Sequence, residues 1–148
     1  MPSATAPLSA LIALAGVVLS SACGGASSGG AAAAPAISEQ TDTGEDVFRH
    51  RCAQCHGSEG RGGRAPNVIG PGTLTVKPPP AAKMRTETFE TAADLLAWTS
   101  KKMPPGTAED LTAAEHTAVV AYMLSASGFK LGDKPLDAQS AKAIRLER

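Results

Sequence analysis

The sequence predicts an all-α domain built from short helices that are joined by loops. Two capping boxes are the main indication: Thr91 precedes Asp94 by three residues, and Thr112 precedes Glu115 by three. This pairing satisfies free N–H groups at the start of a helix. Apolar residues at helical spacing follow both signals. Prolines at 78–80 exclude regular helix from the long segment before the second helix.

Residues 1–22 are predicted to be a signal peptide. The apolar run from Leu8 to Leu19 is shorter than the roughly 20 residues that a membrane span needs and has the length of a signal-peptide core. Small residues then lead to Cys23, an arrangement that resembles the bacterial lipoprotein signal. The resemblance implies cleavage before Cys23 and a lipid on its thiol. An ordinary cleaved signal with an incidental cysteine is the alternative.

A tether and the start of the folded domain are expected next. Residues 23–42 are rich in Gly, Ala and Ser and show no apolar period, which is typical of a flexible linker. The folded domain is expected to cover residues 43–148. Thr43, with Asp46 three residues later, predicts the start of its first helix, and Phe48 gives that helix an apolar face.

The second helix is predicted to follow Thr91, with Leu95 and Trp98 on one face. Two prolines, Pro104 and Pro105, are expected to end it, because the residue before a proline is disfavoured in a helix.

The third helix is predicted to follow Thr112 and to be closed by Gly128. His116 is expected on its solvated surface. An extension begins at about residue 130, and a short amphipathic helix is predicted within residues 137–148.

Composition limits the possible function classes. The chain carries 14 basic and 14 acidic residues, whereas a nucleic-acid-binding domain would be clearly basic. Aromatic residues make up only 3% of the chain. A small domain with so few large apolar side chains has difficulty burying a sufficient core and gains from an additional staple.

The residues CAQCH at positions 52–56 carry the chemistry. Two thiols three residues apart can add to the two vinyl groups of one haem, and C-x-x-C-H is the attachment signature of c-type haem. A zinc site would need four ligands, and a thioredoxin-like motif would need a βαβ setting. Cys52, Cys55 and His56 are therefore predicted to hold one covalent haem c, with His56 beneath the iron.

Around this motif, the residues from Gly44 to about Phe129 resemble a class I cytochrome c, an all-α fold wrapped around one covalent haem. In that family, a glycine and an aromatic residue of the first helix cross an aromatic residue of the last helix, and Gly44, Phe48 and Tyr122 fit those places. A proline after the haem motif offers its carbonyl to the haem histidine, which fixes the ring orientation. The resemblance implies this role for Pro66.

The sixth iron ligand has several candidates. The resemblance implies Met103, because class I cytochromes present their axial methionine on a Met-Pro loop and KKMPPG follows a helix end here. Met84, after the Pro-rich loop KPPPAAK, is the rival. Met123 falls inside a predicted helix and is expected in the core. His50 and His116 are the two histidine candidates. His50 is too close to Cys52 to reach the opposite haem face, and His116 is expected on a solvated helix surface.

Ligation by His and Met raises the reduction potential, and two axial ligands leave no open position for substrate. The resemblance therefore implies a one-electron carrier, not an enzyme, in the periplasm or at the cell surface. The chain looks closest to cytochrome domains that serve periplasmic dehydrogenases, with a quinone or flavin cofactor in the donor. A terminal oxidase or another cytochrome is the expected acceptor, and the chain is expected to be a monomer or a complex subunit.

Two alternatives remain open: a haem enzyme or gas sensor with a displaceable methionine, and a fixed cytochrome subunit of a dehydrogenase or oxidase complex. Trp98 is expected to pack against the haem or its propionates, with ordinary core packing as the alternative. Arg61 and Arg64 are candidates for neutralising the propionates, although solvated loop positions are an equal alternative. Redox partners are expected to dock weakly around the exposed haem edge, near Cys52, Cys55 and the Lys101–Pro105 loop, since the net charge is zero.

Overall fold

The computed structural model describes residues 35–80 and 82–147. Its α-helices are α1 (Ile37–Val47), α2 (Ala53–His56), α3 (Ala92–Lys102) and α4 (Ala113–Ala126). No strand is present in this described part, so the predicted all-α class is confirmed. The predicted signal peptide, Cys23 and most of the predicted tether fall outside it. No helix of the described residues has the length and apolar character needed to cross a membrane.

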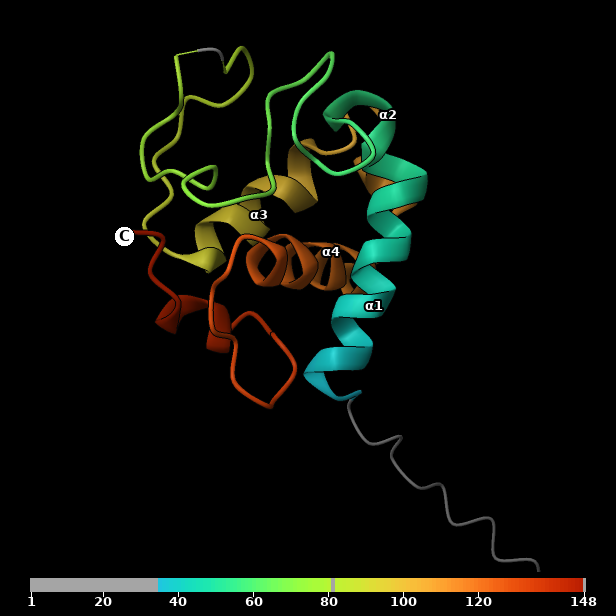
Figure 1. Cartoon of the computed structure of the whole chain (residues 1–148), viewed down its shortest axis with the longest axis vertical. Helices are drawn as coiled ribbons and strands as arrows, with labels where there is room; N and C mark the ends of the chain where they lie inside the picture. Colours follow the sequence, from blue (N-terminus) through green and yellow to red (C-terminus); the bar gives the residue numbers. More distant parts are fainter. Residues whose placement is uncertain (1–34, 81, 148) are drawn as a thin grey trace, which may run out of the picture. The chain divides into compact units, whose positions relative to one another are not determined.

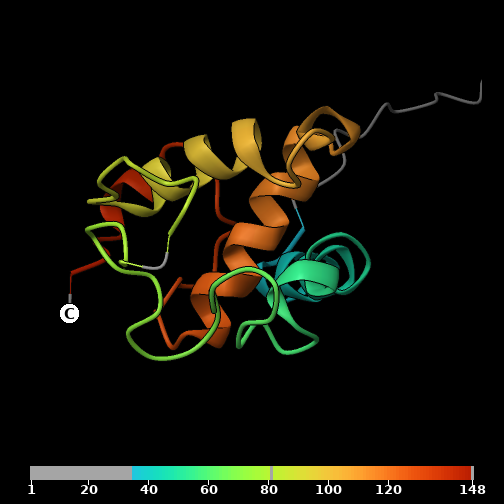
Figure 2. The same ribbon diagram turned by 90° about the horizontal axis from the view of Figure 1, so that it is seen from above.

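Helix α4 is the centre of the fold. It contacts both α1 and α3, and it passes between them in the two views (Figures 1 and 2). A helix that is apolar on most of its sides is buried on most of its sides, and α4 follows this rule. Its buried apolar residues are Ala118, Val119, Val120, Ala121, Met123 and Leu124.

Helix α1 begins at Ile37, and the predicted start at Thr43 is wrong. The Thr43 hydroxyl donates to the backbone carbonyl of Glu39 at 2.9 Å, as a residue inside a helix does. Residues 37–42, which were assigned to the tether, are therefore part of the first helix. The misassignment arose because a capping-box pattern inside a helix looks the same in sequence as one at its start.

A distant contact explains why α1 extends this far. The side-chain amide of Gln40 donates to the backbone carbonyl of Leu136 at 2.9 Å and accepts from its N–H at 2.7 Å. Ile37 also packs against the hydrophobic core. Most helical stability in proteins comes from such tertiary contacts, and these contacts join residues that are 96 positions apart.

The first helix continues into the CAQCH motif through a π-helical turn. The turn covers Phe48–Cys52, and the N–H of Ala53 donates to the carbonyl of Phe48, five residues back. Helix α2 then completes the motif, and Gly57 ends it with a positive φ of 83°. Wide turns of this kind often occur at functional sites, and this one ends at the first cysteine of the motif.

The predicted crossing of α1 and α4 is confirmed. A Cβ atom on Gly44 would lie 2.0 Å from the carbonyl oxygen of Ala118, so the two backbones approach as closely as they do only because residue 44 has no side chain. One turn further along, the rings of Phe48 and Tyr122 lie 5.7 Å apart between centroids with an interplanar angle of 53°. This tilted geometry is favourable for aromatic pairs.

Both capping boxes that the sequence predicted are present. The Asp94 carboxylate accepts from the N–H of Thr91 at 2.9 Å. The Glu115 carboxylate accepts from the N–H of Thr112 at 2.7 Å, while the N–H of Glu115 donates to the Thr112 hydroxyl at 3.2 Å. These local bonds fix where α3 and α4 begin.

Helix α4 ends at Ala126 and is closed by Gly128, as predicted. Gly128 has a φ of 82°, and its N–H donates to the carbonyl of Ser125 at 2.8 Å. The N–H of Phe129 donates to the carbonyl of Leu124 at 3.0 Å. This pair of bonds is the Schellman motif, which glycine favours because it adopts positive φ without strain.

The predicted amphipathic helix in residues 137–148 is wrong. The tail contains one 3₁₀ turn, Ser140–Ala143, and then runs antiparallel to the segment before α3, with a bridge between Thr91 and Arg145. The N–H of Leu146 donates to the carbonyl of Glu90 at 3.0 Å. Backbone bonds to another segment have taken the place of helical bonds. The tail buries Ala141 and Leu146 in the core, together with Leu136 just before it.

Candidate haem site

The two cysteines of the motif are free thiols in this structure. Cys52 lies at the end of the π turn and Cys55 lies in α2, and both are partly buried. Burial raises the pKa of the Cys52 thiol to about 11, against a smaller lowering effect of Arg51 and a small raising effect of Cys55. Neither sulfur is tied up in a disulfide, so both are available for thioether bonds.

His56 is oriented by the residue that the resemblance implied. Its Nδ1 atom lies 2.7 Å from the carbonyl oxygen of Pro66. A carbonyl oxygen only accepts hydrogen bonds, so Nδ1 carries the proton and Nε2 presents a lone pair. A metal-binding histidine typically donates its other ring N–H in this way, which fixes both tautomer and orientation.

The loop after the motif brings Pro66 to this position. It folds back on α2 through two backbone bonds, from the N–H of Gly62 to the carbonyl of His56 at 2.8 Å and from the N–H of Ala65 to the carbonyl of Cys55 at 2.9 Å. Gly62 has a φ of 103°, a conformation that favours glycine. The glycines of this loop therefore allow the chain to turn back sharply onto α2.

A cavity of about 370 Å³ lies beside the motif. Cys52, Cys55 and His56 line it, and so does Pro66. Most of the other lining side chains are apolar, among them Phe48, Leu74, Phe89, Leu95 and Val119. The loops between α2 and α3 (green to yellow in Figure 1) supply one side of it.

Three methionines line the same cavity. Met103 directly follows α3, and its N–H donates to the carbonyl of Thr99 at 2.9 Å. Met84 is 50% exposed on the loop before α3, whereas Met123 is buried in α4 and belongs to the core. Met103 and Met84, the candidate and its rival for the sixth ligand, therefore both line the cavity.

The two histidine candidates do not line the cavity. His50 is exposed, and its Nδ1 lies 2.7 Å from the backbone carbonyl of Asp46. The expectation that His116 is solvated is wrong, because its side chain is only 3% exposed. Its Nε2 donates to the backbone carbonyl of Ala108 at 3.0 Å. The segment before α4 folds over this ring, which helical periodicity alone did not reveal.

Trp98 lines the cavity and forms part of a stack. Its ring lies 5.8 Å from that of Phe89, and the Arg85 guanidinium lies over the other ring at 3.5 Å from its centroid. The indole Nε1 is buried and has no hydrogen-bond partner of normal geometry among the described residues. The pKa of the Glu87 carboxyl is lowered mainly by the backbone N–H groups of Glu87 and Thr86, and the Trp98 side chain makes the smallest contribution.

Arg85 is a cavity residue that the sequence did not indicate. Its Nε donates to the carbonyl of Glu87 at 2.9 Å, and its Nη2 donates to the carbonyls of Thr75, at 2.8 Å, and of Val76. The guanidinium is therefore held in one place along the cavity wall, with Nη1 not used in these bonds. No sequence pattern signals this, because its partners are backbone atoms and a ring contributed by a loop.

The charge of the cavity wall is one-sided, although the chain is neutral as a whole. Arg51, Arg64, Lys83 and Arg85 line the cavity, and no Asp or Glu is among the described residues that do. Arg64 also donates to the carbonyl of Gln54 at 3.3 Å. Arg61 does not line the cavity and instead pairs with Glu59 at 2.8 Å.

These features fit a covalently bound haem. The two thiols and the Nε2 atom of His56 are the donor set that haem c requires. The apolar walls suit the porphyrin face, while the cations that line the cavity suit the carboxylates at its edge. Within residues 35–80 and 82–147, no group of three or more His, Cys, Asp or Glu side chains is placed to hold a bare metal ion.

Comparison with known proteins agrees with this chemistry. A family model described as "Cytochrome C oxidase, cbb3-type, subunit III" matches residues 39–123. No curated protein matches the chain. Among solved structures, the chain is similar to one from the sulfane dehydrogenase SoxCD of Paracoccus pantotrophus, with a TM-score of 0.54 and 26% identity over 72% of this chain. The match spans 52% of that chain, so this chain corresponds to about half of it.

The family match covers more than half of the chain, from the first turn of α1 through the CAQCH motif and α3 into α4. The chain therefore contains a cytochrome c domain and belongs to the cbb3-type oxidase subunit III family of cytochromes c, a family that implies covalent haem c.

Proposed function

We propose that this chain is an exported one-electron carrier whose single haem c is ligated by His56 and Met103. When bound, the haem iron supplies reversible one-electron chemistry. The observation that carries the proposal is the hydrogen bond from His56 Nδ1 to Pro66, which leaves Nε2 for the iron in a cavity that Met103 also lines. If His56 and Met103 both held the haem iron, they would leave it no open position for a substrate, which favours electron transfer over substrate turnover.

The ligation is tested by the weak near-infrared absorption band of a Met–Fe(III) bond. We expect Met103→Ala to abolish the band, because the sulfur is lost. Met84→Ala is the matched control, since Met84 lines the same cavity, and we expect it to keep the band. The reverse result would make Met84 the ligand, and a band that survives in both variants would contradict methionine ligation by either residue.

A second candidate function is a haem enzyme or gas sensor with a displaceable methionine. The observation that favours it is Met84, which is half exposed and lines the same cavity as Met103. Titration of the reduced protein with carbon monoxide separates the two functions. A carrier with a firmly held methionine binds carbon monoxide slowly or not at all, and prompt binding at neutral pH would favour the sensor or enzyme.

The partners that we propose are a dehydrogenase as electron donor and a terminal oxidase or another cytochrome as acceptor. Two findings support redox partners of this kind: the family is described as an oxidase subunit, and the similar solved chain comes from a sulfane dehydrogenase. Both descriptions also suit a fixed complex subunit. Purification from native membranes followed by size measurement decides this point, because a free carrier elutes at the mass of a monomer.

We further propose that the protein lies outside the cytoplasm and is anchored to a membrane by a lipid on Cys23. The support is the sequence around Cys23, which resembles a lipoprotein signal, and the haem motif. Cells fed radiolabelled fatty acid should label the wild-type protein and not Cys23→Ser. An unlabelled, soluble wild-type protein would contradict the anchor without affecting the proposed haem ligation.

A further inference from the structure

The segment after Met103 is held at both of its ends. At the first end, the N–H of Met103 donates to the carbonyl of Thr99 in α3. The chain then turns, with the N–H of Thr107 donating to the carbonyl of Pro104 at 3.1 Å, and enters a short 3₁₀ helix, Ala108–Asp110. Because only four residues separate Met103 from this helix, whatever holds the helix also limits where Met103 can lie.

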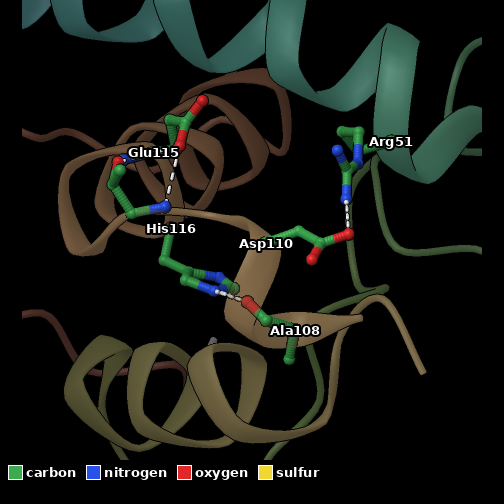
Figure 3. Close-up of polar contacts among 6 residues, drawn as sticks. Arg51, Ala108, Asp110, Glu115 and His116 are labelled. Carbon is green, nitrogen blue, oxygen red and sulfur yellow. Dashed lines mark hydrogen bonds and ion pairs between the residues drawn. The ribbon is translucent and has the colours of Figure 1, made fainter. Parts of the chain in front are cut away.

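The first bond that holds this 3₁₀ helix comes from His116 of α4. The imidazole Nε2 donates to the carbonyl of Ala108 at 3.0 Å, and both residues are buried (Figure 3). Nδ1 of the same ring is buried and has no partner among the described residues. The ring therefore makes one directed polar contact, and that contact is with the segment that follows Met103.

The second bond is an ion pair from the residue that precedes the haem motif. Arg51, which directly precedes Cys52, pairs with Asp110 at 3.0 Å (Figure 3). The side chains of Arg51 and Asp110 are 36% and 53% exposed, and exposed ion pairs of this kind contribute little to the stability of a fold. The bond from His116 is buried, and without it the Ala108 carbonyl would keep only the longer bond, of 3.3 Å, from the N–H of Leu111.

We propose that His116 is a positioning residue that holds the segment 104–110 against α4 and thereby keeps the Met103 sulfur on the iron. This inference rests on the proposed ligation by His56 and Met103. Without the bond to Ala108, conformations with Met103 displaced become more populated, and an external ligand then competes more easily for the sixth position.

The experiment is a titration of the ferric holoprotein with imidazole. Loss of one buried hydrogen bond should raise the apparent affinity for imidazole about tenfold in His116→Leu. His116→Gln should restore an affinity close to wild type, because its amide nitrogen lies the same number of bonds from the backbone as Nε2. If His116→Leu does not take up haem, His116→Asn replaces it, since its shorter side chain withdraws the donor.

A matched control separates positioning from a general loss of stability. Gln40→Leu removes two hydrogen bonds to Leu136 that do not involve residues 103–111, so we expect an unchanged affinity for imidazole. An unchanged affinity in His116→Leu, or an equal rise in Gln40→Leu, would overturn the proposal. Failure of the ligation itself looks different: the near-infrared band would be absent from the wild-type protein or would persist in Met103→Ala.

Discussion

The substitution Gly44→Ala should destabilise the fold through the crossing of α1 and α4. The added Cβ atom would lie 2.0 Å from the carbonyl oxygen of Ala118 and 2.9 Å from the Cβ atom of Tyr122. Ordinary contacts begin near 3.4 Å, so the two helices must separate locally by more than 1 Å. The obstacle is backbone, which cannot rotate away as a side chain can.

Two opposing effects determine how much Gly44→Ala changes the free energy of unfolding. Overpacking of a well-packed core costs about 1–3 kcal/mol, and contact with rigid backbone places this case at the upper end. Alanine gains about 0.5–1 kcal/mol over glycine inside a helix. The net loss of unfolding free energy should be about 2 kcal/mol, which is large against a total of roughly 5–15 kcal/mol for a domain.

Urea denaturation of the holoprotein, followed by the circular dichroism of its helices, measures this difference. Thr43→Ala is the matched control, because Thr43 precedes Gly44 in α1 and is exposed. We expect the control to change the unfolding free energy by less than about 0.5 kcal/mol. A Gly44→Ala protein as stable as the control would refute the argument that this glycine sets the approach of the two helices.

Three other predictions concern charge and the tail. Arg85→Met should lower the reduction potential by roughly tens of millivolts, because a nearby cation stabilises the reduced haem; redox titration should show no such shift in Arg61→Met. Gln40→Leu should lower the unfolding free energy by about 1–3 kcal/mol in urea, since two buried backbone groups of the tail lose their partners. The backbone N–H of Thr112 lowers the pKa of the Glu115 carboxyl from 4.5, so wild type should be more stable than Glu115→Gln at neutral pH. That advantage should vanish as the pH falls below about 4.5 and through the lowered value, and a gap independent of pH would contradict it.

Local signals in the sequence were sufficient to predict where α3 and α4 begin and where α4 is closed. Thr91, Thr112 and Gly128 act on backbone groups within four residues of themselves, so their effect is visible in a short window. The haem motif is local in the same sense. The contact of Pro66 with His56, ten residues apart, was accessible only through the resemblance to a family.

Contacts between distant segments account for what the sequence did not predict. The extension of α1 to Ile37 depends on Gln40, whose partner Leu136 lies 96 residues away. The burial of His116 depends on the return of the chain at Ala108. Arg85 became recognisable as a cavity residue only once its carbonyl partners and the ring beneath it were in place. In each case the deciding partner carries no signal near the residue concerned.

The π-helical turn at Phe48–Cys52 lies between two parts of the chain with different tasks. Gly44 and Phe48 pack against α4, and the two cysteines and the histidine of CAQCH line the cavity. In an uninterrupted α-helix, one residue more or less rotates everything after it by about 100°. Deleting the exposed His50 from this turn would therefore leave Gly44 and Phe48 seated against α4 and swing the CAQCH side chains about the helix axis. The number of residues in the turn, more than their identity, decides which way the haem-binding side chains face.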